Sequence, residues 1–181
     1  LNKQNPPSIL FLANSITHYW GGLTDAFVRR GADSWKTYLD PAGVRNLGYG
    51  WDRIENVLWR VYHGELDGYQ AKQVMIMIGT NNIGFNTNEE IIAGLRLLVQ
   101  AIKIRQPSAN ILLMGIFPRR GQEERIVTLN EQIVQLAGDE NITYTNPGIH
   151  LLNASGKIEE AYFTDGLHPN EKGYGFIGKA L

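Results

Sequence analysis

The most informative absence in this chain is cysteine, of which its 181 residues contain none. Disulfides, thiolate metal sites and cysteine nucleophiles are therefore excluded together. No apolar run approaches the ~18 residues that a membrane-spanning helix needs. Runs of like charge are absent as well, and 17 Lys and Arg residues against 18 Asp and Glu residues give a formal net charge of −1. This composition predicts no nucleic-acid partner and no membrane span.

Two further absences narrow the classes of function. No group of histidine and carboxylate residues has the spacing of metal ligands, so no metal and no other cofactor is expected. The segment ANSITHYWGG, which follows the first apolar run, lacks the glycine-rich loop of a nucleotide or flavin binder. The chain begins with Leu1 rather than Met, for which a removed signal peptide is one explanation and a shortened chain another. Secreted, periplasmic and cytoplasmic locations remain open, and so does the oligomeric state.

The residues that are present are typical of one globular domain spanning 1–181, with 43% hydrophobic and 19% charged residues. Short apolar runs alternate along the chain with longer segments of helical period. Strands are predicted at residues 8–12, 43–48, 73–79, 110–117 and 142–146. Helices are predicted within residues 52–66, 87–107, 123–137 and 170–181.

The clearest predicted strand, at residues 73–79, is continuously apolar rather than alternating, which is typical of parallel strands covered on both faces. Strands and helices in alternation, with short joins, predict right-handed βαβ units and an α/β fold, a three-layer α/β/α sandwich. In such sheets the functional crevice lies beyond the carboxyl ends of the strands. Candidate functional residues should therefore follow the predicted strands directly.

Polar and glycine-rich segments occupy these strand ends and the turn before the last helix. They are residues 14–15, 48–52, 79–82, 118–120 and 165–169. Together they supply a serine, a histidine and a carboxylate, which is the set that acyl transfer uses. Backbone N–H groups of a glycine turn and an asparagine amide are suitable donors to an oxyanion.

The spacing of Asp165 and His168 favours a joint role. Pro169 restrains His168 to extended geometry and is itself suited to a helix start, so the imidazole is held in front of the helix. Asp165, on the same turn, is expected to reach the far ring nitrogen and to select its tautomer. Taken alone, Ser15 is more typical of a helix N-cap and Asn81 of a turn. Their convergence on one sheet edge favours catalysis.

Four segments, ANSIT, NLGYGWD, GTNN and DGLH, resemble in order and spacing the four blocks of the SGNH hydrolases, also called the GDSL esterase/lipase family. The segment from NLGYGWD to IGTNN is further similar to the catalytic subunits of the platelet-activating-factor acetylhydrolase Ib type. The resemblance implies a flavodoxin-like sandwich of about five parallel strands. It implies Ser15 as nucleophile, His168 as base and Asp165 as its partner. It also implies an oxyanion hole from the Ser15 N–H, a backbone N–H of Gly50 or Trp51, and the Asn81 side chain.

Two positions depart from the family pattern. Ala13 and Asn14 replace the usual Gly-Asp before the serine, and alanine is accommodated there only if its φ is negative. Trp51 stands where the family has its oxyanion glycine, just before Asp52. A backbone N–H needs no particular side chain, so Gly50 and Trp51 both remain candidates as donor.

These residues predict a serine esterase that hydrolyses small acyl esters, with O-acetyl esters of carbohydrates as the first choice, through an acyl-enzyme intermediate. Asn14, Trp51 and Arg119 are the predicted substrate contacts, and Trp20 is placed close enough to the rim to stack on a sugar or line an acyl slot. His18 is interpreted as a partly exposed surface histidine, with a place in the cleft as the alternative. Two other functions remain open: hydrolysis of phospholipid or lysophospholipid acyl esters, and a non-catalytic flavodoxin-like binding module.

Overall fold

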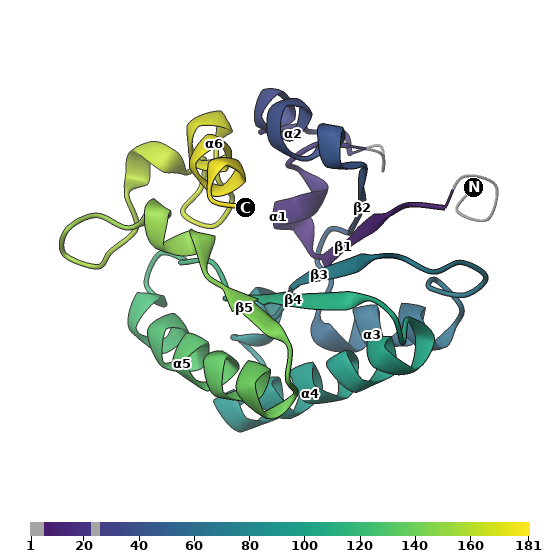
Figure 1. Cartoon of the computed structure of the whole chain (residues 1–181). Helices are drawn as coiled ribbons and strands as arrows, with labels where there is room; N and C mark the ends of the chain where they lie inside the picture. Colours follow the sequence, from purple (N-terminus) through teal and green to yellow (C-terminus); the bar gives the residue numbers. More distant parts are fainter. Residues whose placement is uncertain (1–5, 23–25) are drawn as a thin grey trace.

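A five-stranded sheet forms the centre of the molecule (Figure 1). The structure is a computed structural model that describes residues 6–22 and 26–181, so Leu1 lies outside the described residues. The order β2-β1-β3-β4-β5, parallel throughout, is the doubly wound order of flavodoxin-like sheets, and the prediction of about five parallel strands is confirmed. The strands are β1 (Ile9–Ala13), β2 (Val44–Gly48), β3 (Gln73–Met77), β4 (Asn110–Met114) and β5 (Thr143–Thr145).

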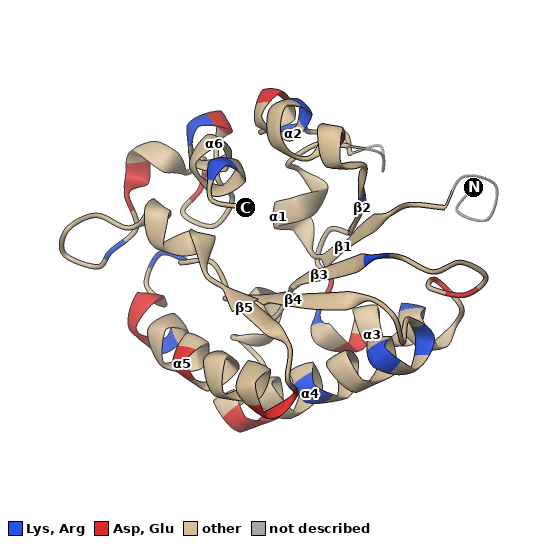
Figure 2. Cartoon of the chain, in the orientation of Figure 1, with Lys and Arg blue, Asp and Glu red and all other residues tan. Residues whose placement is uncertain are grey.

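Helices cover both faces of the sheet, which confirms the three-layer architecture (Figure 1). One face carries α1 (Ser15–His18), α2 (Ala32–Tyr38) and α6 (Glu171–Lys179), and the other carries α3 (Ile54–Tyr62), α4 (Asn88–Arg105) and α5 (Glu123–Asp139). Figure 2 shows charged residues mainly on helices and loops, while the strands are largely free of them. Among the described helices, none is long and apolar enough to cross a bilayer.

Sequence signals at both ends explain where α4 begins and ends. Thr87 caps α4 in a capping box with Glu90, and the helix ends at Arg105, shortly before Pro107. Helix α3 ends at Tyr62, four residues before the predicted limit at Leu66. Helix α2 was not predicted, because it has only seven residues and its N-cap, Gly31, offers no side-chain hydrogen bond.

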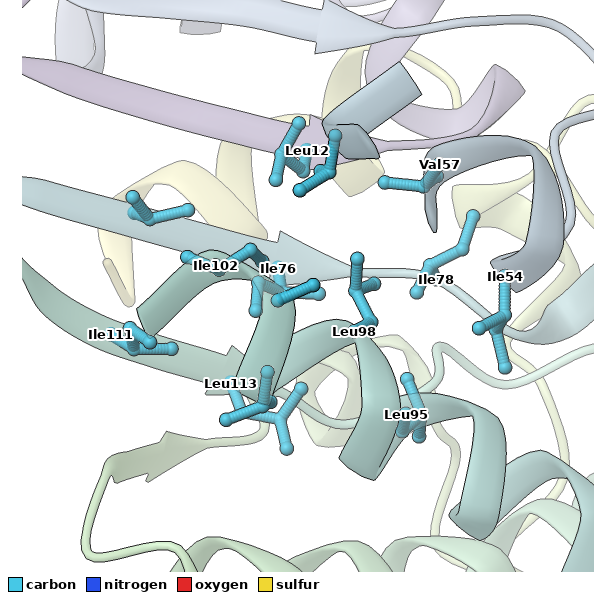
Figure 3. Close-up of a cluster of buried hydrophobic side chains, with 14 of the residues drawn as sticks. Leu12, Ile54, Val57, Ile76, Ile78, Leu95, Leu98, Ile102, Ile111 and Leu113 are labelled. Carbon is cyan, nitrogen blue, oxygen red and sulfur yellow. The ribbon is translucent and has the colours of Figure 1, made fainter. Parts of the chain in front are cut away.

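Two separate apolar cores fill the layers, because successive residues of a strand point to opposite faces. In β1, Leu10 and Leu12 belong to the core under α3, α4 and α5, whereas Phe11 and Ala13 belong to the core under α1, α2 and α6. Figure 3 shows part of the first core, where strand residues such as Leu12 and Ile76 gather with helix residues such as Leu98. Each such side chain, fully buried, contributes roughly 1.5–3 kcal/mol to folding.

Trp20 belongs to the second core, and its predicted place at the rim is wrong. Its side chain has no exposed surface, and its ring stacks on Tyr174 with centroids 5.0 Å apart. The indole N–H donates to the Ser34 hydroxyl at 2.8 Å, which satisfies its only polar atom. A buried and fully satisfied indole contacts no substrate, so Trp20 serves the packing of α1 against α2 and α6.

Candidate active site

Ser15 is the first residue of α1, immediately after the carboxyl end of β1. Asn14 is the N-cap, and its side-chain oxygen accepts from the N–H of Ile16 at 2.9 Å. The turn into the helix is free of strain at Ala13, because Trp51 and Asn141 are the only non-glycine residues with positive φ in the described part of the chain. Alanine therefore fits where the family has glycine.

Ser15 meets the loop before α6, 153 residues further along the chain. The Nε2 atom of His168 lies 2.9 Å from the Ser15 hydroxyl oxygen, and the Nδ1 atom lies 2.8 Å from Oδ2 of Asp165. An ionised carboxylate only accepts, so Nδ1 carries the proton and Nε2 is free to accept from the serine hydroxyl. The three side chains form one continuous chain of hydrogen bonds.

The 165–168 turn holds Asp165 in place through its second oxygen. Oδ1 accepts from the backbone N–H of Leu167 at 3.1 Å and from that of His168 at 2.8 Å. Burial raises the pKa of Asp165, but these N–H bonds and the bond from the imidazole outweigh burial and hold the pKa well below its usual range. The carboxyl group is therefore ionised at neutral pH.

His168 has the protonation state that a general base needs. Burial lowers the pKa of His168, and the neighbouring Asp165 carboxylate raises it without cancelling the effect of burial. The net shift is downward, so the imidazole is neutral at pH 7 and able to accept a proton.

The candidate oxyanion donors come from the ends of β1, β2 and β3. The N–H of Ser15 lies in the first turn of α1, where backbone N–H groups have no partner within the helix. Asn81 lies in the 3-10 turn η2 (Thr80–Asn82), and its Nδ2 donates to the Asp52 carbonyl at 2.9 Å. An amide NH₂ group has two hydrogens, so this bond leaves one for a ligand.

Trp51 has a backbone conformation that explains the glycine of the family pattern. Its φ is +67°, in the left-handed region that glycine adopts without cost, and its side chain is 85% exposed. The chain therefore keeps the glycine-type turn with a residue that fits it less well. The exposed indole projects from the loop that supplies the second candidate oxyanion donor.

The predicted substrate contacts have different outcomes. Asn14 is fully buried, and its Nδ2 is enclosed as well, so the prediction that it contacts substrate is wrong. Its role is to cap α1. Arg119 is half-buried after β4, where its Nη1 lies 3.4 Å from the Thr80 carbonyl oxygen, and its charge contributes to lowering the pKa of His168. A substrate contact by Arg119 stays a prediction.

His18 is half-buried, which agrees with the prediction of a partly exposed histidine. Its ring stacks on Tyr19 at 5.7 Å and lies 6.0 Å from the ring of Tyr49. Burial lowers the pKa of His18, and Asp52 opposes the effect. A side chain added at Gly50 would point toward His18 and Tyr19, at 3.9 Å from each. His18 thus lies with Tyr19 and Tyr49 beside the loop at residues 49–52.

Asn46 supports the site from beneath and was missed by the sequence analysis. It is fully buried in β2, and its Nδ2 donates to the carbonyls of Thr17 and Gly21 at 2.7 and 2.6 Å. Its Oδ1 accepts from the N–H of Gly48 at 2.8 Å. Asn46 therefore fastens α1, which carries Ser15, to the end of β2. The signal was an asparagine beside Arg45 in the middle of the predicted strand 43–48.

Arg60 was also missed, and it fixes the loop that carries Trp51. Its guanidinium donates to Asp52 at 2.8 Å and to Glu65, and it lies 4.4 Å from the Tyr49 ring centroid. Burial raises the pKa of both carboxyl groups, and the charge of Arg60 opposes that rise. No local sequence pattern predicts this network, because Asp52, Arg60 and Glu65 lie on a loop, a helix and a turn. Within the described ranges, no cluster of three or more potential ligand side chains is arranged to hold a metal ion.

Comparison with known proteins agrees with this geometry. The model of the GDSL-like Lipase/Acylhydrolase family matches residues 14–176. The chain is 27% identical over 185 residues to human platelet-activating factor acetylhydrolase IB subunit alpha1, covering 99% of this chain and 76% of the relative. It is 29% identical to the alpha2 subunit from Bos taurus, with 99% and 76% covered.

Solved structures show the same fold. A GDSL-like lipase from Bacteroides thetaiotaomicron superposes with a TM-score of 0.78 at 20% identity, covering 95% of this chain and 84% of that one. A psychrotrophic esterase from Pseudoalteromonas sp. has a TM-score of 0.70 at 21% identity, covering 95% and 92%. With the family model spanning the serine, asparagine and histidine segments alike, this chain belongs to the GDSL-like lipase/acylhydrolase family and is a carboxylic ester hydrolase.

Proposed function

We propose that this chain is a single-domain serine esterase that hydrolyses small acyl esters, O-acetyl esters first among them, through an acyl-enzyme intermediate. One observation carries the proposal: the unbroken hydrogen-bond chain from the Ser15 hydroxyl through His168 to Asp165. A serine hydroxyl is a weak nucleophile until a positioned base removes its proton. This chain of contacts provides the base and the group that orients it.

In the first step, Ser15 Oγ attacks the ester carbonyl carbon while His168 Nε2 takes the hydroxyl proton. The carbonyl oxygen becomes an oxyanion, for which the Ser15 N–H, a backbone N–H of Gly50 or Trp51 and the Asn81 amide are the proposed donors. The tetrahedral intermediate collapses, the ester C–O bond breaks, and the imidazolium gives its proton to the leaving alkoxide. Asp165 stays ionised and stabilises the imidazolium.

In the second step, water replaces the alcohol. His168 Nε2 takes a proton from the water as its oxygen attacks the acyl carbon. The new tetrahedral intermediate breaks the bond to Ser15 Oγ, which recovers its proton from the imidazolium. The products are a carboxylic acid, the alcohol and the unchanged enzyme, and no cofactor enters the balance.

Labelling with a fluorophosphonate probe and hydrolysis of p-nitrophenyl acetate test the nucleophile. Wild type is expected to label and turn over, and Ser15→Ala to do neither while keeping its fold by circular dichroism. Ser155→Ala, which removes an exposed serine hydroxyl at a loop tip, is the matched control and keeps both signals. A folded Ser15→Ala variant with the wild-type rate would exclude this nucleophile. A wild type that neither labels nor hydrolyses would instead favour a non-catalytic binding module.

The alcohol half of the ester has two candidates. An exposed indole at Trp51, on the oxyanion loop, favours a sugar ring on which it stacks. The names of the relatives, platelet-activating factor acetylhydrolase subunits, favour a phospholipid acyl ester as the alternative. Comparing kcat/KM for an acetylated sugar and for an acetylated choline phospholipid distinguishes the two. Loss of kcat/KM for the sugar in Trp51→Ala, with p-nitrophenyl acetate hydrolysis retained, would support stacking.

Asn81 and its neighbour Asn82 give a matched pair of variants for the oxyanion hole. Asn81→Ala is expected to lower kcat about 10²–10³-fold with little loss of stability. Asn82 is buried, accepts from the first N–H of α3 and donates to Glu55, so Asn82→Ala is expected to lose about 1–2 kcal/mol of stability instead. Equal kcat values for wild type and Asn81→Ala would remove Asn81 from the oxyanion hole.

A further inference from the structure

Arg30 contacts the carboxylate of the triad from a segment that the mechanism does not use. It lies between α1 and α2, outside any helix or strand, and its side chain is 23% exposed. Its Nη1 donates to Asp165 Oδ2 at 3.1 Å, and this is the same oxygen that lies 2.8 Å from His168 Nδ1. A carboxylate oxygen has two lone pairs, so it accepts both bonds at once.

The same nitrogen of Arg30 also binds Thr164, which connects the two ends of the loop at residues 164–168. It donates to the Thr164 hydroxyl oxygen at 2.7 Å, and that hydroxyl in turn donates to the carbonyl of His168 at 2.9 Å. The Thr164 N–H donates to that carbonyl as well, at 2.9 Å. Both ends of the loop that carries the acid and the base are thus linked to one guanidinium.

The other contacts of Arg30 reach the helix that carries the nucleophile. Its backbone N–H donates to the carbonyl of Tyr19 at 2.7 Å, and its guanidinium lies 5.2 Å from the Tyr19 ring centroid. Tyr19 is the C-cap of α1, whose first residue is Ser15. The Tyr19 ring lies 5.1 Å from the imidazole of His168. Arg30 therefore touches both halves of the site, which are far apart in the sequence.

We propose that Arg30 is a positioning residue that locks the loop of Asp165 and His168 against the helix of Ser15. It touches no reacting atom, and its role rests on the proposed esterase function. Pinning Oδ2 from a second direction fixes the carboxylate plane, and the carboxylate fixes the imidazole. Supporting contacts of this kind set the precision of a catalytic constellation, because they restrict the rotation that the other bonds of the carboxylate still allow.

The charges around His168 determine how the pKa of its imidazole changes when Arg30 is substituted. From its own loop Asp165 raises the pKa of His168, whereas the guanidiniums of Arg30 and Arg119 lower it, in addition to burial. The uncharged Ser15 hydroxyl and the Tyr19 ring complete the surroundings from α1. Removing the charge of Arg30 therefore raises the pKa of His168. A loosened fold that exposes the imidazole would raise this pKa as well, because burial lowers it, so Arg30→Lys, which keeps the charge, separates the two causes.

The kinetic experiment compares Arg30→Met, Arg30→Gln and Arg30→Lys with Arg96→Met. The control also removes one arginine charge, from α4, where Arg96 pairs with Asp139 and Glu140. Both neutral variants are expected to lose about 10–100-fold in kcat with little change in KM, as loss of an outer contact to a site residue typically does. In both variants the acidic limb of the pH profile of kcat/KM moves to higher pH. His168 acts as base only when it is unprotonated, and its pKa is higher without the charge of Arg30. Arg30→Lys keeps the positive charge and a hydrogen-bond donor, so its pH profile and most of its kcat are expected to match those of wild type.

A second measurement is independent of turnover. In the Ser15→Ala background, NMR titration of the His168 imidazole is expected to show a higher pKa with Arg30→Met or Arg30→Gln and no change with Arg30→Lys. The His150 imidazole, in the 3-10 turn η3 (Pro147–Leu151), is the internal reference. A folded neutral variant with kcat within about twofold of wild type and an unmoved His168 titration would overturn the proposal. If wild type hydrolyses no ester, the proposed function fails, yet this titration still decides whether Arg30 acts on His168.

Discussion

Gly48, at the end of β2, is the position where one added methyl group should damage catalysis most directly. A Cβ built there lies 2.8 Å from the Asn14 carbonyl oxygen, 2.8 Å from the backbone nitrogen of His18 and 3.0 Å from the Thr17 Cβ. All three belong to the helix that carries Ser15 or to its cap. None of them is the far end of a flexible side chain, so either the helix or the strand must move.

The size of that movement follows from the contact distances. Ordinary van der Waals contact begins at 3.4 Å, so a separation of 2.8 Å must grow by 3.4 − 2.8, about 0.6 Å. A misplacement of 1 Å in a reacting group can cost about 10²-fold in rate. Gly48→Ala is therefore expected to lower kcat by roughly 10-fold or more. Overpacking of this kind also costs about 1–3 kcal/mol of stability.

Steady-state hydrolysis of p-nitrophenyl acetate and urea unfolding measure both effects. Gly138→Ala is the matched control, because Gly138 lies in α5, has no neighbour within 4 Å of an added Cβ and is exposed. That control should keep wild-type kcat and gain about 0.5–1 kcal/mol, as alanine does over glycine inside a helix. If Gly48→Ala matched Gly138→Ala in rate and stability, the close approach of β2 and α1 would not constrain the nucleophile.

Three further predictions test other parts of the site. Asn46→Ala removes the side-chain partner of the Gly21 carbonyl and of the Gly48 N–H, and one of two donors to the Thr17 carbonyl, which keeps the Trp20 N–H. A loss of about 3 kcal/mol in urea unfolding is expected, and a loss under 1 kcal/mol would contradict this account. Trp51→Gly should be more stable than Trp51→Ala by about 1 kcal/mol in thermal unfolding, the reverse of the usual order, because φ is positive there; the usual order would argue against the left-handed turn. The acidic limb of kcat/KM should have its midpoint below the ordinary histidine value of 6.5, because burial lowers the pKa of His168 and activity falls as pH drops through it; a midpoint above 6.5 would mean that Asp165 outweighs burial.

The fold was predictable because its signals are local, and so was the pairing of Asp165 with His168, whereas Ser15 was joined to them only by the position of the strand ends and by the family resemblance. Continuous apolar runs mark buried parallel strands, and Asp165 and His168 share one short turn closed by a proline. The strand ends were less predictable, since residues such as Ile78 and Ile116 are buried beyond the last paired residues of β3 and β4. Apolar character indicates burial there but not ladder hydrogen bonds.

The supporting residues could not be predicted, because their partners are distant in the sequence. Arg30 and Asp165 are separated by 135 positions, and no periodicity relates them. Trp20 illustrates the opposite error: it is near Ser15 in the sequence, but the turn after α1 directs its ring into the core with Tyr174. Asn14 was likewise adjacent to the nucleophile and is wholly enclosed. Nearness along the chain does not decide which way a side chain faces.

Because all strands are parallel, the carboxyl ends and the amino ends of the strands lie at opposite ends of the sheet and have different functions. Every candidate reacting group lies past a carboxyl end or in the turn before α6, whereas connections that enter the strands lie at the opposite end of the sheet. The connection from α4 to β4, at residues 106–109, is one of these, with Pro107 and Ser108 exposed, and β4 spans about 16 Å between it and the reactive end. An immobilisation tag or a fused module inserted there would leave the hydrolytic edge facing solution, so the architecture provides its own attachment point.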